Sequence, residues 1–205
     1  MRRSATMDAY LREPEGACLV ERSFAAFAAQ GAFGLVVWGR PAINEARRIV
    51  LARGAELTAA PHALLLDYRL VEMIDIEAFG LMGTWLGEHR DALTRVTSRA
   101  ALILPTEPYA GATVAGFYQV HPPPYPSQIC RSLDEAAAWL GEPVVRVATQ
   151  VHELSAAGRS TSSALASLLD RSPGLSLDEA ATALGTSGRT LQRRQIGRAS
   201  CRERV

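Results

Sequence analysis

Short apolar runs alternate with amphipathic stretches along most of this 205-residue chain. Five of the apolar runs predict strands, and they occupy residues 18–28, 33–38, 63–68, 101–104 and 128–131. The run HALLLDY is apolar almost throughout, as expected for a central strand that is buried on both faces. Because helical patterns fall between most of these strands, the sequence predicts an α/β fold in which helices cover a mixed sheet.

Helical periodicity predicts the elements between the strands. The first helix spans residues 44–57, with Asn44 as its N-cap and with Arg53 on its inward side. The second follows a short acidic turn within residues 71–90 and directs five side chains toward the sheet: Phe79, Leu81, Met82, Trp85 and Leu86. The segment TEPYAGATVAGFYQV predicts a third helix, and HPPPYP predicts a rigid loop that a sheet interior cannot hold.

The α/β region is predicted to end with an edge strand, SQICRS, and a short helix. Ser132 and Glu135 form a capping box at the start of that helix, and Gly141 ends it. Apolar residues at helical spacing from Val144 onward then predict a connecting helix. We therefore assign residues 1–142 to an α/β regulatory domain, 143–162 to a connecting helix and loop, and 163–195 to part of a small all-α domain.

The segment SLDEAATALGTSGRTLQRR, residues 176–194, has the pattern of two helices joined by a tight turn. Ser176 and Glu179 form a second capping box, and Gly185 closes the first helix. Ser187 can cap a second helix, in which Leu191 is the buried residue. The polar residues around it are Arg189, Thr190, Gln192, Arg193 and Arg194.

This segment resembles the first helix-turn-helix of AraC-type transcription regulators, and the match is closest in SGRTLQR. The resemblance implies that the second helix enters the major groove of double-stranded DNA, with Arg189, Gln192 and Arg193 at base edges. Thr190 and Arg194 would then contact phosphate. The AraC-type domain has a second helix-turn-helix that this chain lacks, so the resemblance implies a truncated domain. The alternative is a pair of packed helices without a role in DNA binding.

The last ten residues, IGRASCRERV, match the translation of a sequencing-library adapter. We therefore expect residues 196–205 to be an artificial tail and the natural gene to continue beyond Gln195. The alternative is a natural basic tail. The formal net charge of the chain is +1, and the tail holds three Arg and one Glu, which leaves the remainder slightly acidic. Whole-chain charge therefore gives no indication of nucleic-acid binding, whereas the Arg cluster at residues 188–194 does.

The region from about Phe33 to Gly141 resembles a STAS-type domain, similar to bacterial anti-sigma-factor antagonists. The resemblance lies in the order of elements and in MIDIEAFG, which stands where that family has an Ile-Asp-Ser-Ser-Gly-like turn. Asp75 fits the turn, but Ile76 occupies the position of the phosphorylated serine and Glu77 follows it. The resemblance therefore implies a protein-interaction or sensing domain whose phosphorylation switch cannot operate. Glu77 either mimics a charged state or is an ordinary acid in a first helical turn.

Enzymatic motifs are missing from the sequence. The acids Asp67, Glu72, Asp75 and Glu77 are close in sequence, but no His accompanies them at a useful spacing. The four His are scattered, and neither a phosphate-binding glycine motif nor a GxSxG elbow occurs. We expect no catalytic residue, no cofactor and no metal site, and we expect Trp38, Trp85 and Trp139 to be core residues.

The three Cys have no CxxC spacing, and the sequence has no readable signal peptide and no apolar run long enough to span a bilayer. These features predict a cytoplasmic protein without a disulfide framework. The leading hypothesis is a DNA-binding transcription regulator with an N-terminal sensing or interaction domain, whose partners are double-stranded DNA and either a second copy of the chain or a regulatory protein. The alternative is a STAS-like interaction module of a signalling pathway that does not bind DNA.

Overall fold

The structure is a computed structural model, and it describes residues 1–144, 146–151, 153 and 176–183. The chain divides into two compact units, Met1–His152 and Glu153–Val205. The first unit contains the sheet and nearly all of the described helices. In the second unit the described residues form the short helix α8 (Leu177–Ala183). No helix among the described residues is long and apolar enough to cross a membrane.

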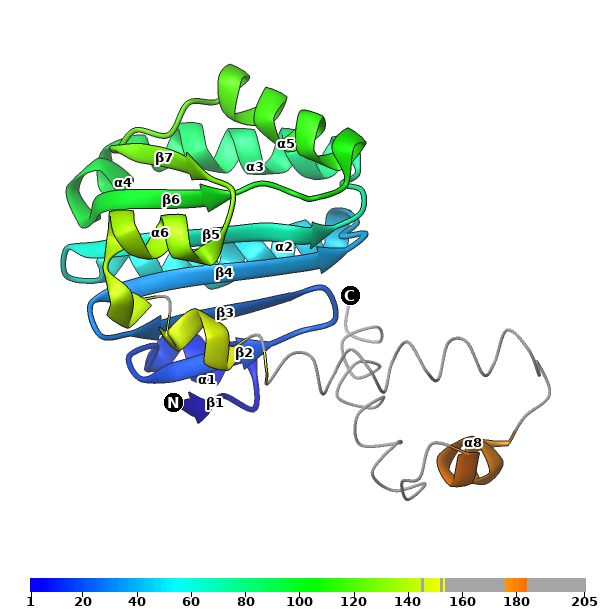
Figure 1. The fold of residues 1–205 in the computed structure, drawn as a ribbon. Coiled ribbons are helices and arrows are strands. Elements are labelled where there is room, and N and C mark those ends of the chain that lie inside the picture. The colour runs from blue at the N-terminus through cyan, green and yellow to red at the C-terminus, as the bar shows by residue number, and fades with distance from the viewer. Residues whose placement is uncertain (145, 152, 154–175, 184–205) are drawn as a thin grey trace. The chain divides into compact units, whose positions relative to one another are not determined.

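The first unit is built on a sheet of seven strands whose spatial order is the same as their order in the chain (Figure 1). The strands are β1 (Arg2–Arg3), β2 (Ala17–Val20), β3 (Phe24–Ala29), β4 (Ala32–Gly39), β5 (His62–Val71), β6 (Thr97–Ile103) and β7 (Ser127–Cys130). The pairs β2·β3 and β3·β4 are antiparallel, whereas β1·β2 and the pairs from β4 to β7 are parallel. The predicted mixed sheet is therefore confirmed.

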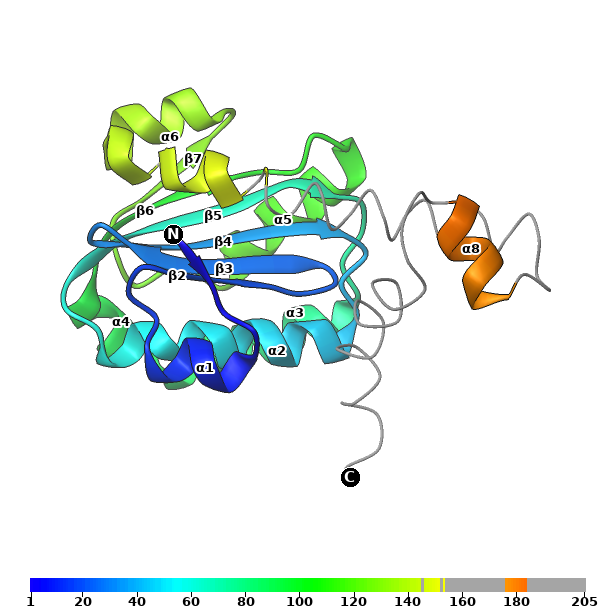
Figure 2. The same cartoon turned by 90° about the horizontal axis from the view of Figure 1, so that it is seen from below.

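Helices cover both faces of this sheet. Five lie on the first face: α1 (Met7–Arg12), α2 (Ile43–Arg53), α3 (Ile76–Glu88), α4 (Arg90–Val96) and α5 (Pro108–Val120). The opposite face carries α6 (Leu133–Leu140) and a following helical stretch through residues 142–144 and 146–151. Figure 2 shows α6 on one side of the sheet and α1, α2, α3 and α4 on the other.

Strand β5 is central and buried on both faces, as HALLLDY predicts. Leu64, Leu66 and Tyr68 pack under the first-face helices, while Leu65 packs under the helices of the opposite face. This alternation follows from the two-residue period of a strand. The same packing makes Trp38 and Trp85 core residues, at 7% and 8% exposure, and leaves Trp139 partly buried with its indole N–H donating to the Ala100 carbonyl.

The hairpin β3–β4 turns through Gln30 and Gly31, which both have positive φ, at 55° and 73°. This backbone matches the twist of the two strands and is the usual solution for a two-residue hairpin. Within the hairpin, Phe27 lies opposite Gly34, and a Cβ at Gly34 would lie 2.0 Å from the Phe27 ring. The glycine is therefore required for the ring to lie across the neighbouring strand.

Several predicted boundaries were wrong. Residues 18–28 form two strands, because the chain reverses after Glu21, whose N–H donates to the Phe24 carbonyl at 2.8 Å. Helix α2 begins at Ile43, and its N-cap is Ala42 without a side-chain hydrogen bond, so Asn44 is not the cap. Its end tightens into a 3₁₀ turn, η1 (Gly54–Thr58). The helix predicted within residues 71–90 ends at Glu88, and the separate helix α4 follows His89.

Candidate carboxyl-edge interaction surface

The segment MIDIEAFG connects the carboxyl end of β5 to helix α3. Asp75 is the N-cap of α3, in extended backbone, and its carbonyl accepts from the N–H groups of Ala78 and Phe79 at 3.0 and 3.2 Å. The Asp75 side chain makes no capping hydrogen bond. Glu77 lies exposed in the first turn of α3, where the helix dipole favours an acid.

Large apolar side chains are exposed around this turn. Ile76 is 82% exposed and Met73 is 46% exposed, although both belong to residue types that are usually buried. Leu70, near the end of β5, and Tyr109, in the first turn of α5, are 43% and 68% exposed. We name these four residues the carboxyl-edge surface, because they lie at or just after the carboxyl ends of β5 and β6.

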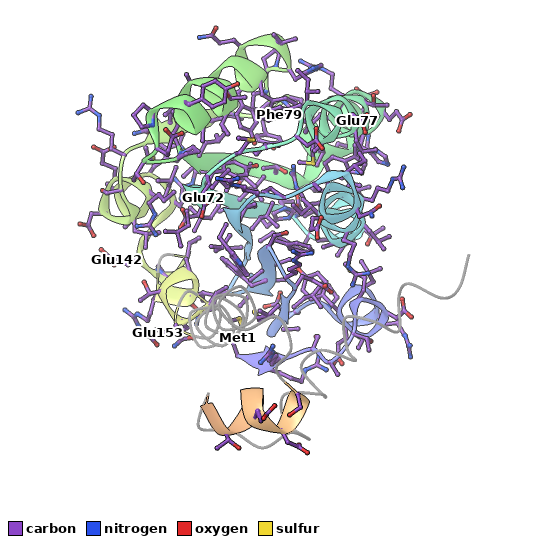
Figure 3. All side chains as sticks on the ribbon, turned by 90° about the vertical axis from the view of Figure 1, so that its right-hand side faces the viewer. Met1, Glu72, Glu77, Phe79, Glu142 and Glu153 are labelled. Carbon is purple, nitrogen blue, oxygen red and sulfur yellow. The ribbon has the colours of Figure 1, made fainter. Side chains whose placement is uncertain are left out.

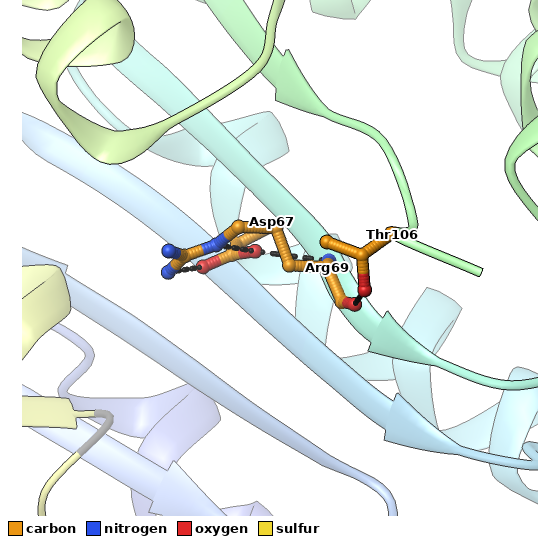
Figure 4. A network of polar contacts seen from close by, with 3 residues as sticks. All are labelled: Asp67, Arg69 and Thr106. Atoms are coloured by element: carbon orange, nitrogen blue, oxygen red, sulfur yellow. Dashed lines mark hydrogen bonds and ion pairs between the residues drawn. The ribbon is translucent and has the colours of Figure 1, made fainter.

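Hydrogen bonds fix the β6–α5 loop against the end of β5. The backbone N–H and the hydroxyl of Thr106 both donate to the Arg69 carbonyl, at 3.3 and 3.2 Å (Figure 4). Glu107 then caps α5 by accepting from the Ala110 N–H at 2.7 Å. The first turn of α5, with Tyr109, is thereby held beside the strand end that carries Leu70.

Acidic side chains surround the carboxyl-edge surface. Glu72, Asp75, Glu77 and Glu107 are all exposed, and Glu72 forms an ion pair with Arg40 at 3.2 Å. Figure 3 looks onto this edge and shows Glu72 and Glu77 there, with Phe79 between α3 and α5. The same segments therefore carry exposed apolar and exposed acidic side chains, and we name these four acids the acidic rim.

Asp67 does not join these acids. It lies on β5 at 1% exposure, and the Arg69 guanidinium donates to both of its carboxylate oxygens, at 3.0 and 2.8 Å (Figure 4). The hydrogen bond to Asp67 raises the pKa of Arg69 above its ordinary value. The four acids that are close in sequence therefore do not converge, because one of them is buried and paired.

The amino ends of the parallel strands show a different arrangement, which we name the amino-edge polar group. Its members are Arg53, Glu56, His62 and Thr97, all at 3% exposure or less. Arg53 donates to both Glu56 oxygens, at 2.8 and 3.0 Å, and lies over the Trp85 ring at 4.7 Å. Burial alone would lower the pKa of Arg53, but the adjacent Glu56 raises it well above the ordinary value. The sequence indicated that Arg53 points inward but gave no signal of its partner.

Three tyrosines lie buried near this ion pair. The hydroxyls of Tyr68 and Tyr118 form a hydrogen bond at 2.8 Å, and burial raises the pKa of both and of Tyr125.

Among the described residues no group of three or more His, Cys, Asp or Glu could hold a metal ion. Cys18 and Cys130 are both buried and free.

In the second unit, α8 begins with the capping box that the sequence predicts. The Ser176 N–H donates to the Glu179 carboxylate at 2.8 Å, and the Glu179 N–H donates to the Ser176 hydroxyl at 3.3 Å. These hydrogen bonds lower the pKa of Glu179. The five residues expected to contact DNA lie outside the described residues: Arg189, Thr190, Gln192, Arg193 and Arg194.

No protein-family model matches the chain, and no curated protein matches it. Among solved structures, the chain is similar to an uncharacterized protein of the DUF3478 family from Shewanella loihica PV-4, which is described as having a SpoIIAA-like fold. The two chains are 15% identical, and the match covers 58% of this chain and 92% of that one with a TM-score of 0.42.

Proposed function

We propose that the first unit is a STAS-like protein-interaction module that binds its partner through the carboxyl-edge surface. The observation that supports this most is the exposure of Ile76 and Met73 beside a turn whose backbone is fixed by Asp75. Exposed apolar side chains that cluster within a polar rim mark interaction sites on soluble proteins. Because the turn is held by hydrogen bonds, the partner binds a surface that is already formed.

The negative charge of the acidic rim indicates which side chains the partner presents. Glu77, Asp75 and Glu107 contribute negative charge around the apolar side chains, and Arg40 is engaged by Glu72. A partner that places an apolar side chain against Ile76 and Lys or Arg around it would be complementary in shape and in charge. Residues 73–80 contain neither Ser nor Thr, so a kinase cannot switch this binding at the turn.

Site-specific photocrosslinking tests this proposal. A photoreactive phenylalanine analogue at Ile76 should crosslink the chain to one host protein, which mass spectrometry identifies. The matched control is the same analogue at Val120, which is 73% exposed at the far end of α5. With the purified partner, Ile76→Asp should weaken binding at least tenfold. Equal crosslinking from both positions, or undiminished binding by Ile76→Asp, would refute the proposal.

The second candidate function is DNA binding by the C-terminal unit, favoured by the capping box of α8 and by SGRTLQR after it. If Arg193 and Gln192 read base edges, Arg193→Ala and Gln192→Ala should each cost about 1 to 3 kcal/mol at the operator and leave non-specific binding nearly unchanged. Arg194→Ala should weaken binding to all sequences and lower the salt dependence by about one unit of slope.

Operator titrations at two salt concentrations measure these effects. The 205-residue chain, with one such motif, should bind DNA only near the non-specific range of about 10⁻⁴ to 10⁻⁶ M. Tight, sequence-selective binding by this chain would contradict the boundaries assigned to the DNA-binding unit.

A further inference from the structure

The two margins of the sheet differ in how they meet solvent (Figure 1). At one margin, β1 has only two residues, and both are Arg. A short, charged edge strand resists pairing with another chain. At the other margin, β7 has the uncharged sequence SQIC, and within the described part of the chain no strand pairs with its outer side. The β7 strand itself therefore carries no charge that would keep a further strand away.

The hydrogen bonds of β7 show which of its backbone groups face outward. The Ala100 N–H of β6 donates to the Pro126 carbonyl at 2.8 Å, just before β7 begins. Because the backbone groups of successive residues in a strand alternate in direction, those of Gln128 also face β6, and those of Ser127 and Ile129 face away from it. The outer side of β7 therefore directs two N–H donors and two carbonyl acceptors toward a neighbouring strand.

An apolar side chain and an open groove lie beside these groups. Ile129 is 55% exposed, and it is in register with Leu102, which belongs to the core beneath the first-face helices. A groove of about 540 Å³, open to solvent, separates β7 from α5. Ala115 and Gln119 line it from α5, Ser127 and Ile129 line it from β7, and no lining side chain is charged. An uncharged strand with an apolar side chain is complementary to this groove, and β7 itself has that composition.

We propose that a second copy of the chain pairs with this margin, β7 against β7 in antiparallel orientation, about a two-fold axis at Gln128. In this register Ser127 lies opposite Ile129 of the second copy, and such a pair exchanges two hydrogen bonds. The two equivalent pairs use all the outward groups of both strands. An axis at Ile129 would instead pair Ser127 with Arg131, whose N–H already donates to the Glu135 carboxylate at 2.7 Å.

The same register brings each Ile129 to the groove of the other copy. Side chains that lie opposite each other in an antiparallel pair are on the same face, and Ser127, opposite Ile129 of the second copy, lines the groove. No like charges meet near the axis, as they would if two β1 strands paired through Arg2 and Arg3. The dimer is closed, because each copy uses its uncharged margin and keeps the charged one outside.

This inference does not depend on the proposed function. Antiparallel pairing directs the carboxyl ends of the strands in opposite directions in the two copies. The two carboxyl-edge surfaces therefore lie at opposite ends of the dimer, where each can bind its own partner.

Sedimentation equilibrium of the full chain tests the dimer. Between about 1 µM and about 1 mM the mass should rise from one chain toward two, because a pair of short strands is a small interface that dissociates on dilution. Ile129→Arg brings two cations close to the axis and should weaken the dimer at least tenfold. The matched control is Leu51→Arg, on α2 at 49% exposure, which should dimerise like the unchanged protein. A mass of one chain throughout, undiminished dimerisation by Ile129→Arg, or equal loss in both variants would overturn the inference.

Disulfide crosslinking tests the register and needs no variant that disrupts the strand. Gln128 opposes itself across the axis in a non-hydrogen-bonded pair, whose Cα separation of about 4.5 Å suits a disulfide. With Cys201 replaced by Ser, Gln128→Cys should form a covalent dimer under mild oxidation. The control is Arg2→Cys, on the opposite margin, which should stay monomeric on a denaturing gel. Absence of the covalent dimer from Gln128→Cys, or equal yields from the two positions, would overturn the inference.

Discussion

In most proteins polar side chains are exposed and large apolar ones are buried, and the two ends of the parallel strands each break a different half of this rule. At the amino end, four polar side chains are buried, and at the carboxyl end, four large apolar side chains are exposed. Arg53 and Glu56 satisfy each other at the amino end, and Arg53 also lies over the Trp85 ring of α3. Ile76 and Met73 have no such internal role.

This contrast predicts that residues at the amino end determine stability and that residues at the carboxyl end determine binding. A buried ion pair rarely adds net stability, but breaking it is costly because it leaves an uncompensated charge. Exposed apolar side chains contribute little to folding, and where several gather they mark an interaction site. We therefore expect substitutions at the amino end to change the free energy of unfolding, and substitutions at the carboxyl end to change binding.

The largest expected effect is at Glu56. Glu56→Gln removes the charge that compensates the buried Arg53 guanidinium and should lower the free energy of unfolding by about 3 to 5 kcal/mol. Urea unfolding followed by Trp fluorescence measures this for the first unit alone, because all three Trp lie in it. The matched control is Glu72→Gln, in the exposed Arg40–Glu72 pair, with an expected cost below about 1 kcal/mol. If the two variants lost similar amounts of unfolding free energy, the two ends of the strands would not differ in their effect on stability.

The buried tyrosines predict a loss of stability at high pH. Burial raises the pKa of Tyr68, Tyr118 and Tyr125, whereas the unfolded chain titrates near the ordinary value of about 10. Above that pH the unfolded state releases protons that the folded state retains, so this contribution is complete below about pH 10 and is lost as the pH rises further. The slope should reach up to about 1.4 kcal/mol per pH unit for each tyrosine.

Urea midpoints between pH 8 and pH 11, together with phenolate absorbance, measure this alkaline effect. Tyr68→Phe should flatten the pH dependence, and Tyr109→Phe, at an exposed position, should leave it unchanged. A midpoint that stays constant up to pH 11 would show that the tyrosines titrate normally in the folded protein.

A smaller effect is expected at Thr97, also at the amino end. Its hydroxyl is buried and has no hydrogen-bond partner among the described residues. Thr97→Val keeps the shape and removes the unsatisfied group, so the variant should be more stable by about 1 kcal/mol. Thermal unfolding of the two proteins compares them, and a lower Tm for Thr97→Val would mean that the hydroxyl makes a hydrogen bond after all.

The smallest effect on folding is expected at the carboxyl end. Ile76 is 82% exposed, so Ile76→Ser should change the free energy of unfolding by less than about 0.5 kcal/mol. The same urea titration measures it. A cost above about 1 kcal/mol would mean that Ile76 packs in the folded unit, and the carboxyl-edge surface would lose its main member.

The sequence predicted those features that depend on local patterns. The apolar run HALLLDY gave a central strand, and the capping residues Ser132 and Ser176 mark helix starts in the structure. The Asn44 cap was wrong because α2 begins at Ile43, with Ala42 as its N-cap, so Asn44 already lies within the first turn of the helix.

Features that depend on tertiary packing could not be predicted. Glu56 lies three residues after Arg53, a spacing that usually places an ion pair on a solvated helix face. The 3₁₀ turn η1 instead takes Glu56 into the core. The exposure of Ile76 is likewise decided by where α3 begins, since a shift of two residues would place it at the buried position that Ala78 occupies. The turn MIDIEAFG was identified for its resemblance to a STAS motif, but its apolar surface was not.

The identity of spatial and chain order in the sheet has a consequence for synthesis on the ribosome. The two-residue turn at Gln30 and Gly31 lets β3 and β4 pair locally as soon as they emerge. Each later strand, from β5 to β7, then finds its neighbour already in place and needs only its own helical crossover to reach it. We expect the nascent sheet to grow in one direction, from β4 to β7, so that new strands add at only one of its two edges.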